Sequence, residues 1–543
     1  KLFKEYNSEW FEDAETVRQI KVKEGKFKDG FDFVVGNPPY GDILDSESKK
    51  NNQSRYPLVA DYEISQYFLA LGEELLKEKG YLGYIVTNTF MLNVNAENFR
   101  KQLLETCRAP QIVDLSRISV FLDPKVRNII LLLNKELNTN LRNMSDVNAF
   151  ICTDIKEGSL NVEFFNKTNL ESLFRDDKEW LYIFRAKSNI MGIIKKIRSN
   201  TKRLDDITEV SQGLIPYDKY RGHSPEIIKK RIWHADYKKD ETYRKELRGG
   251  DVKRYSLLWN GKQWISYGKW LAAPREPKFF QSPRILIREI TDDKTGQINA
   301  TYTEDEYYNN PSIINVINKP NIAHNLKYLL SIINSKPLAF YHLHTSPKAK
   351  KGLFPKILVE DVRSIPIKPT SKGIQQKFVH FVDQVLEING TLPTLEGKTT
   401  NIQKLLDDFD VPLGDLADIS GIRLELKERI GKPKIKREDL KIYLDRKSYI
   451  ECENEALAAY IELYLTSLSD TLRGKTKPEF VKLIQIPKSL TQVKEVLNKR
   501  KELKRKLENL KQRRDEIDKE IDRRVYKLYG LTEKEIKIVE GRD

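Results

Sequence analysis

The chain is poor in the features that would assign a protein to a simple class. Only three cysteines occur among its 543 residues, Cys107, Cys152 and Cys452, too widely spaced for a disulfide framework or a metal-ligand pattern. No apolar run is long enough to span a bilayer, and no signal peptide stands out. We therefore expect a protein of a reducing cytoplasm. The first residue is Lys1 rather than Met, as in a processed product or a part of a longer one.

The composition favours large folded domains and an acidic partner. Hydrophobic residues make up 39% of the chain and aromatic residues 10%, enough for sizeable cores in about three or four domains. The net charge is +16 and the pI about 9.2. This balance favours binding to a nucleic acid, although many lysine-rich surfaces bind nothing.

A rigid polar loop follows a short apolar segment near the start of the chain. Phe31–Gly36 predicts a buried strand, and Asn37-Pro38-Pro39-Tyr40 comes directly after it. The exocyclic amine of adenine is a poor nucleophile because its lone pair is delocalised into the ring. Acceptors on the Asn37 side chain and the Pro38 carbonyl would localise that lone pair, and Tyr40 offers a flat face to a flipped base. The same four residues could instead be only a turn after a strand.

This loop resembles the catalytic loop of the adenine-specific DNA methyltransferases. The resemblance implies direct methyl transfer from S-adenosylmethionine to a flipped adenine, without a metal. It makes the four residues Asn37, Pro38, Pro39 and Tyr40 catalytic, and it places Asn37 and Pro39 beside the cofactor.

Two later segments extend the resemblance. Gly83–Phe90 is similar to the family's strand and loop beside the target base, where Asn88 and Phe90 are expected to be wall or packing residues. Val120–Arg127 is similar to the segment whose aromatic residue stacks on the base, so Phe121 would hold the adenine against Tyr40. A core phenylalanine is the alternative for Phe121.

Strands and helices alternate over the first 135 residues, which predicts an α/β fold. Strands are expected at Phe31–Gly36, Tyr81–Val86, Ile112–Leu115 and Asn128–Leu133, with helices at Glu63–Glu78 and Ala96–Cys107. This order indicates half of a parallel, doubly wound methyltransferase sheet.

The family's glycine-rich cofactor loop is missing from the segment where it should stand. Residues 1–30 hold only Gly25 and Gly30, and no such loop occurs elsewhere. A half-sheet would also leave an unpaired central edge, which natural proteins avoid. We therefore expect an upstream segment or a partner chain to carry the cofactor loop and complete the sheet.

Residues 176–370 resemble the target recognition domain of type I specificity subunits and of fused type IIG restriction–modification enzymes. The resemblance rests on phrases such as Val210–Leu214, Gly249–Tyr255 and Tyr328–Lys336. Basic and aromatic residues interleave there, as contact with phosphates and bases requires. The candidates for contact with double-stranded DNA are Lys253, Arg254, Arg275, Lys348, Lys350 and Lys351.

The remaining segments divide by composition. We expect a catalytic half at 1–140, a connector at 141–175, a spacer helix at 371–395, an unassigned small α/β segment at 396–490 and a coiled-coil-like tail at 491–543. The loop Asp42–Tyr56, with Lys49, Lys50 and Arg55, is expected to be either mobile and facing DNA or a plain surface loop.

The predicted function is therefore a site-specific adenine DNA methyltransferase of a bacterial or archaeal restriction–modification system. No convincing nuclease pattern surrounds Asp205, Arg288 and Glu289, so Mg²⁺ would be needed only by a nuclease domain outside this chain. Two alternatives stay open: a non-catalytic DNA-binding specificity module, and an RNA or protein methyltransferase with the same loop.

Overall fold

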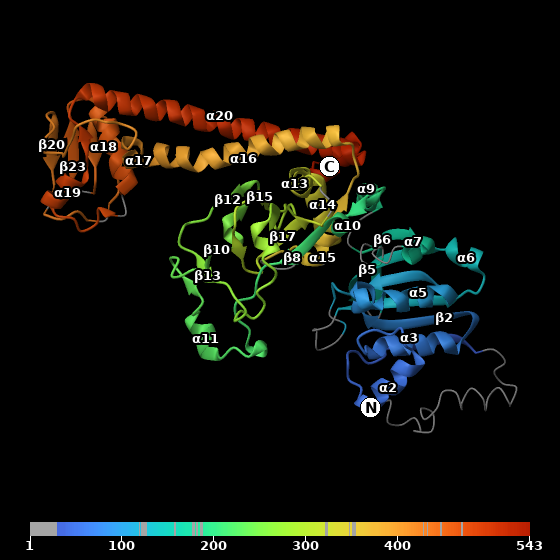
Figure 1. Ribbon diagram of the computed structural model, residues 1–543. Helices are drawn as coiled ribbons and strands as arrows, with labels where there is room; N and C mark the ends of the chain where they lie inside the picture. The colour runs from blue at the N-terminus through green and yellow to red at the C-terminus, as the bar shows by residue number, and fades with distance from the viewer. Residues whose placement is uncertain are drawn as a thin grey trace. The chain divides into compact units, whose positions relative to one another are not determined.

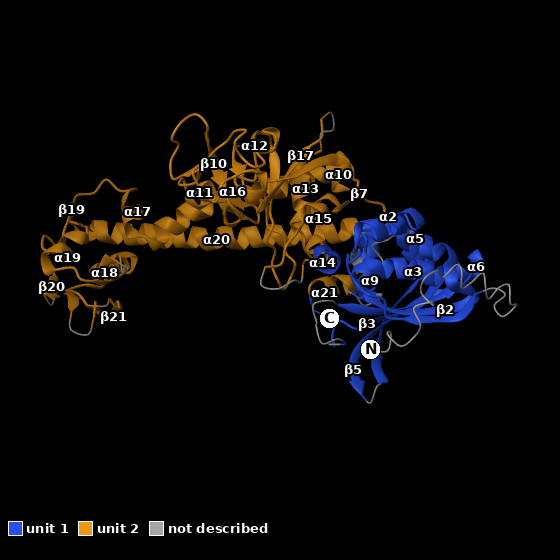
Figure 2. Cartoon of the chain, turned by 90° about the horizontal axis from the view of Figure 1, so that it is seen from below, with its two compact units in different colours: residues 1–199, 341–347, 541–543 blue, residues 200–340, 348–540 orange. Residues whose placement is uncertain are grey.

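The computed structural model describes most of residues 30–542, which form two compact units (Figure 2). The gaps in the described range are 119, 121–126, 157–158, 176–179, 181–182, 185–187, 321–323, 347, 350–353, 427, 432, 446–447 and 469–470. The first unit comprises residues 1–199, 341–347 and 541–543, and the second comprises 200–340 and 348–540. Phe121, Lys350 and Lys351 lie outside the described residues. Within the described residues, no helix is both long and apolar enough to cross a membrane.

The first unit is built on a six-stranded sheet in the order β1-β2-β4-β3-β5-β6 (Figure 1). Its strands are β1 (Phe31–Gly36), β2 (Leu76–Thr87), β3 (Cys107–Asp114), β4 (Asn128–Lys135), β5 (Asp146–Lys156) and β6 (Ser159–Asn169). The α/β fold predicted from the sequence is confirmed. The sheet is mixed rather than parallel, however: β1 pairs with β2 and β3 with β5 in parallel, whereas β4 runs antiparallel to both of its neighbours. Among the described residues no helix stands between β3 and β4, and antiparallel neighbours need no crossover helix.

Side chains alternate between the two faces of this sheet. On one face Leu82, Tyr84 and Val86 of β2 join a core that is covered by helices. Those helices are α3 (Ile64–Leu75), α4 (Thr89–Leu92), α5 (Glu97–Thr106) and α7 (Leu170–Arg175). The opposite face holds a smaller cluster around Val113 and Cys152.

The outer strand β1 exposes apolar side chains on that second face. Phe33 is 70% exposed and Val35 is 81% exposed, and the Phe33 ring stacks on Tyr81 at 6.2 Å. Among the described strands, β1 pairs with β2 alone. An apolar strand at a sheet edge is a template for pairing, so this edge is a natural place for further structure.

Two segments of the first unit that were expected as a loop and as a polar connector with one or two strands hold regular structure. The loop after the predicted catalytic residues holds the helix α2 (Ser46–Arg55), which Asp45 caps by accepting from the N–H groups of Glu47 and Ser48. The expected connector holds α6 (Thr139–Asn143) and the paired strands β5 and β6, which extend the sheet. The first unit continues through α9 (Ser188–Arg198) to residue 199.

The second unit begins with two small sheets. One has the order β15-β14-β17-β8, and the other has the order β16-β10-β13-β9. The strands are β8 (Thr208–Gln212), β14 (Arg284–Arg288), β15 (Ala300–Thr303), β17 (Ile313–Asn318), β9 (His234–Ala235), β10 (Tyr243–Leu247), β13 (Trp264–Ser266) and β16 (Tyr308–Asn309). Shorter elements complete this part: β7 (Lys202–Arg203), α10 (Leu204–Ile207), α11 (Pro225–Lys230), β11 (Val252–Lys253), β12 (Ser256–Leu257), α12 (Lys278–Gln281), α13 (Leu326–Ile333), α15 (Val359–Arg363) and β18 (Pro366–Ile367). The helix α14 (Lys336–Thr345) begins in this unit, and its residues from Tyr341 onward belong to the first.

Two long antiparallel helices follow, and they pack along one another. They are α16 (Lys372–Thr400) and α20 (Leu490–Tyr529). Contacts run in opposite sequence directions, since Arg500 donates to the Thr399 carbonyl and Arg524 lies over Phe381. The apolar spacing that predicted a helical tail is confirmed: Leu503, Leu507, Ile517, Ile521 and Val525 are buried.

A small α/β module occupies the sequence between the two long helices. Its four-stranded antiparallel sheet has the order β20-β23-β22-β21. The elements are α17 (Ile402–Leu406), β19 (Leu413–Gly414), β20 (Ile422–Glu425), β21 (Lys436–Glu438), β22 (Lys441–Tyr443), β23 (Tyr449–Cys452), α18 (Glu455–Leu468), α19 (Lys477–Leu483) and β24 (Ile486–Pro487), and α21 (Glu533–Val539) follows α20.

Candidate active site and recognition surface

The predicted catalytic loop begins where β1 ends. Gly36 pairs with Tyr84 of β2, and a Cβ on Gly36 would lie 3.1 Å from the Tyr84 ring, so glycine suits this close approach. The next residues alternate in exposure: Asn37 is exposed, Pro38 is buried and Pro39 is exposed. The loop is therefore anchored by one proline and presents the Asn37 side chain to its surroundings.

Tyr40 joins the loop to the neighbouring strand. Its hydroxyl donates to Oδ1 of Asn37 at 2.6 Å, and the carbonyl oxygen of Ile85 lies 3.2 Å from the same hydroxyl. Burial raises the pKa of the Tyr40 phenol, and the nearby Asn128 amide partly opposes this effect. Tyr40 is thus a neutral hydrogen-bond donor at ordinary pH, and it shares one end of the sheet with Asn37.

Three groups at this site were not foreseen from the sequence. The carbonyl of Ile85 faces Tyr40, and the buried Asn128 lies beside it. The carboxylate of Glu63 accepts from the N–H of Gly41. Glu63 stands just before an amphipathic helix, so its role as a cap could have been inferred, but its reach back to Gly41 depends on the tertiary fold.

The segments predicted to lie beside the target base are joined. The N–H of Asn88 donates to the carbonyl of Arg127 at 2.8 Å. Phe90 is almost fully buried and packs edge-on against Phe99 and Trp180, as expected of a packing residue. The predicted stacking residue Phe121 belongs to the second of these segments and lies outside the described residues.

The basic residues after the catalytic loop are partly paired. Lys49 lies 2.8 Å from Asp42, with its ammonium over the Tyr62 ring, and Arg55 lies 2.8 Å from Glu74. Lys50 is exposed on α2. Ion pairs at exposed positions contribute little to stability, so these side chains can exchange partners.

The predicted DNA contacts of the second unit fall into different settings. Lys253, Arg275 and Lys348 are exposed. Arg254 instead donates to the carboxylate of Asp518 on α20 and, through Nε and Nη2, to the carbonyl of Asn334. Arg254 therefore bonds the turn between β11 and β12 to the long helix α20, and its guanidinium is engaged within the fold.

Asp205 and Glu289, whose surroundings in sequence show no nuclease pattern, are engaged in ion pairs. Asp205 accepts from Arg203 at 2.9 Å, and this pair holds the pKa of Asp205 below its usual range. Glu289 lies 3.1 Å from Lys356. Among the described residues, no group of three or more His, Cys, Asp and Glu side chains could hold a metal ion.

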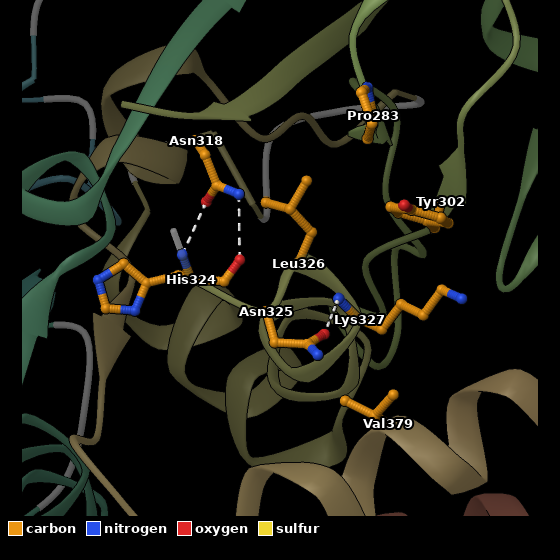
Figure 3. Close-up of a pocket in the computed structure, with 8 residues that line it drawn as sticks. All are labelled: Pro283, Tyr302, Asn318, His324, Asn325, Leu326, Lys327 and Val379. Atoms are coloured by element: carbon orange, nitrogen blue, oxygen red, sulfur yellow. Dashed lines mark hydrogen bonds between the residues drawn. The ribbon is translucent and has the colours of Figure 1, made fainter. Parts of the chain in front are cut away.

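A cavity of about 290 Å³ opens beside α13 in the second unit (Figure 3). Asn318 exchanges two hydrogen bonds with the backbone of His324, and Asn325 caps α13 by accepting from the N–H of Lys327. The Lys327 ammonium is paired with Asp383 at 2.6 Å. Because these polar groups are engaged with one another, we assign the cavity no part in the chemistry.

Comparison with known proteins identifies two regions. Residues 2–121 match the Eco57I restriction-modification methylase family, and residues 244–367 match the TaqI-like C-terminal specificity domain.

Individual relatives share parts of the chain. A Methanocaldococcus jannaschii protein, provisionally assigned as a type II restriction enzyme and methyltransferase, is 28% identical over 373 residues, which are 67% of this chain and 30% of that protein. The type II methyltransferase M.BstVI of Geobacillus stearothermophilus is 36% identical over 94 residues, 17% of each chain. The type IIL restriction-modification enzyme MmeI, solved in complex with DNA, aligns with a TM-score of 0.40 and 10% identity over 66% of this chain and 49% of its own. The chain thus spans less than a third of the first of these relatives.

Proposed function

We propose, on the premise that this chain carries the methylase region and the specificity domain of type II restriction–modification enzymes, that it takes part in methylating adenine at a defined sequence in duplex DNA. The reaction would move a methyl group from the sulfonium of S-adenosylmethionine to the exocyclic nitrogen of an adenine flipped out of the helix, with release of S-adenosylhomocysteine and of one proton from that nitrogen. The single observation that carries this proposal is the exposed Asn37 side chain at the end of β1, which already acts as a hydrogen-bond acceptor.

The loop has the features needed to hold an aromatic amine. Oδ1 of Asn37 accepts one N–H of the amine and the Pro38 carbonyl accepts the other, so the nitrogen lone pair points away from the ring. Tyr40 covers one face of the base, and Phe121 covers the other. Because both acceptors sit on a proline-stiffened loop, little ordering is required when the base arrives.

The residues present fit the reactive end of S-adenosylmethionine. Asn37 and Pro39 are exposed directly after β1, where a carbonyl oxygen and an apolar ring can border a positively charged methyl donor. The cofactor supplies an electrophilic methyl group, and the chain's own residues only orient the amine and exclude water.

The cofactor loop and the strands that complete the sheet would come from an upstream segment or a partner chain. The exposed Phe33 and Val35 support this part of the proposal, as does the position of β1 at the end of the described sheet. A parallel strand beside β1, with a helix over Phe33, would bury both features.

In the second unit, the exposed Lys253, Arg275 and Lys348 are proposed phosphate or base contacts. Basic side chains at such positions supply affinity through the DNA backbone, and a subset reads base edges. Lys350 and Lys351 remain proposed contacts from the sequence alone.

A second candidate function is a DNA-binding specificity module without activity of its own. The match of residues 244–367 to a specificity domain favours it, because DNA recognition by such a domain does not require the loop at Asn37. The two candidates differ in whether Asn37 is needed for methyl transfer or has only a structural role.

The deciding experiment measures methyl transfer from labelled S-adenosylmethionine to duplex DNA, with the chain alone and with its upstream segment restored. Labelled N6-methyladenine after restoration, and at least a hundredfold lower rate for Asn37→Ala with unchanged DNA binding, is the expected result. Sequence-specific binding without any transfer by the restored protein would instead establish the specificity module.

A further inference from the structure

We infer that Glu63 is a positioning residue of the proposed methyl-transfer site: its carboxylate fixes the end of the loop that carries Asn37 and Tyr40. This inference rests on the proposed function. Glu63 lies 22 residues after Gly41, where the loop ends, and stands at the start of the helix α3.

The loop leaves the site through Gly41, and both backbone groups of that residue are bonded to the start of α3. The Gly41 N–H donates to Oε1 of Glu63 at 2.8 Å, and the Gly41 carbonyl accepts from the N–H of Ile64 at 3.2 Å. Gly41 has a φ of +86°, a conformation that side chains other than glycine rarely adopt. The reversal of the chain at Gly41 is therefore held by two adjacent residues of one helix end.

The same carboxylate oxygen also caps that helix. Oε1 of Glu63 accepts from the N–H of Ser65 at 3.4 Å and from the Ser65 hydroxyl at 2.9 Å. The helix is fixed in turn, because Tyr67 and Leu69 are buried in the core of the first unit. Glu63 thus transmits the position of a packed helix to a loop that is otherwise partly exposed.

The other end of the loop is fixed independently. Pro38 is buried, and the Tyr40 hydroxyl reaches the carbonyl of Ile85 on β2. With Glu63 in place, the loop is tied to β2 on one side and to α3 on the other. Asn37 and Pro38, which carry the two amine acceptors, come directly before these attachments in the chain. Loss of the bond to Glu63 frees the exit of the loop at Gly41 and lets the acceptors shift.

A movement of this kind affects the reaction more than it affects binding. A misplacement of about 1 Å in a reacting geometry can lower a rate by roughly a hundredfold. A hydrogen bond from a backbone N–H to a carboxylate is stronger than one to a neutral acceptor, which suits it to this restraint. A carboxamide at the same position would keep an accepting oxygen and most of the restraint.

The test uses the complete enzyme with Glu63→Ala, Glu63→Gln and the control Asn138→Ala. Asn138 caps α6 in the same unit by accepting from two backbone N–H groups, as Glu63 caps α3, but it does not contact the loop. The kcat and the KM for DNA are measured together with amide hydrogen exchange of the peptide that contains Gly41.

For Glu63→Ala we expect kcat to fall at least tenfold, the KM for DNA to stay within about threefold and exchange at Gly41 to accelerate. Glu63→Gln should stay within about threefold of the native kcat, and Asn138→Ala should match the native enzyme. A native kcat for Glu63→Ala, or equal losses for the alanine and glutamine variants, would overturn the inference. If the native enzyme transfers no methyl group while exchange at Gly41 still depends on Glu63, the proposed function fails and the restraint on the loop stands.

Discussion

The Tyr40 hydroxyl lies 2.6 Å from Oδ1 of Asn37, so the oxygen proposed to receive the target amine already holds a hydrogen-bond donor. The carbonyl of Ile85 lies 3.2 Å from the same hydroxyl and offers it a second acceptor. An incoming adenine can therefore take the place of the phenol on Asn37 while the phenol keeps a hydrogen bond to β2. Oδ1 of Asn37 and the Tyr40 hydroxyl thus each keep a hydrogen-bond partner during the exchange, so the free-energy cost of the exchange is low.

This relationship predicts different effects for two substitutions of Tyr40. Tyr40→Phe keeps the ring and removes the competing donor, so kcat should stay within about threefold of native and the KM for DNA should not rise. Tyr40→Ala removes the stacking face, which is worth about 1–3 kcal/mol per base, and should lower kcat/KM by roughly tenfold or more. Steady-state methyl transfer to duplex DNA measures both. Equal losses in the two variants would assign the effect to the hydroxyl and contradict the exchange.

The open edge of the first sheet yields a prediction about assembly. Phe33→Glu places a charge on a side chain that is 70% exposed, so the thermal midpoint of the first unit should hardly change. The substitution should nevertheless block association with the cofactor-binding portion and lower S-adenosylmethionine binding at least tenfold. Phe164→Glu, at a 60% exposed position on β6, is the matched control and should leave both properties intact. If the Phe33→Glu variant associated normally with the cofactor-binding portion, this face of β1 would be ruled out as the contact surface.

Neighbouring basic residues in the second unit should separate stability from DNA binding. Arg254→Ala breaks the bonds to Asp518 and Asn334 and should lower the free energy of unfolding by about 2 kcal/mol, without changing the salt dependence of DNA affinity. Lys253→Ala should leave stability unchanged and reduce the slope of log affinity against log salt by about 0.9. Denaturant unfolding and salt titrations of DNA binding distinguish the two. A smaller slope for Arg254→Ala would show that it contacts phosphate after all.

Asp522 on α20 gives the second unit a pH dependence. Burial raises its pKa to about 6, although the Lys336 N–H, the Arg254 guanidinium and the Lys336 ammonium oppose the shift, while Asp518 adds to it. In the unfolded chain the carboxyl ionises near its ordinary value of 3.8. Between pH 4 and 6 the folded chain therefore binds more protons than the unfolded chain, and stability falls as the pH rises through this window.

Replacing that carboxyl should remove the dependence. Asp522→Asn keeps an oxygen for the Lys336 N–H and should raise the free energy of unfolding at pH 7 by up to about 3 kcal/mol, with a flatter profile between pH 4 and 6. Asp515→Asn, at an exposed position on the same helix, should change neither property. Chemical denaturation at several pH values measures this, and a lower stability of Asp522→Asn at pH 7 would contradict it.

The local pattern of the sequence predicted the elements around the site well. Periodic apolar residues placed α3 and α20, the alternation of strands and helices placed α5, and the apolar run before Asn37 placed β1. These predictions succeed because each element buries a face that its own sequence defines. The direction of β4 is not encoded in its own apolar pattern, which is the same for a parallel and an antiparallel strand. The parallel sheet expected from the order of elements was wrong because β4 runs antiparallel to β2 and to β3.

The candidate site was less predictable than the fold. Asn37 and Tyr40 are three residues apart, so their hydrogen bond is local, whereas Glu63, Ile85 and Asn128 come together only through tertiary packing. Arg254 shows the opposite limit. Its neighbours in sequence suggest an exposed basic side chain that could contact DNA. Only its bond to Asp518, 264 residues away, shows its structural role.

The pairing of α16 with α20 gives the chain a defined insertion point. The chain leaves α16 after Thr400 and returns at Leu490, and Arg500 still bonds to the carbonyl of Thr399 at 2.8 Å. The end of α16 therefore lies beside a point ten residues inside α20, roughly 15 Å from the start of that helix, and the module is an insertion between two paired helices. Such a module can be exchanged or lost in the course of evolution while α16 and α20 stay paired and Arg254, between β11 and β12, stays bonded to α20.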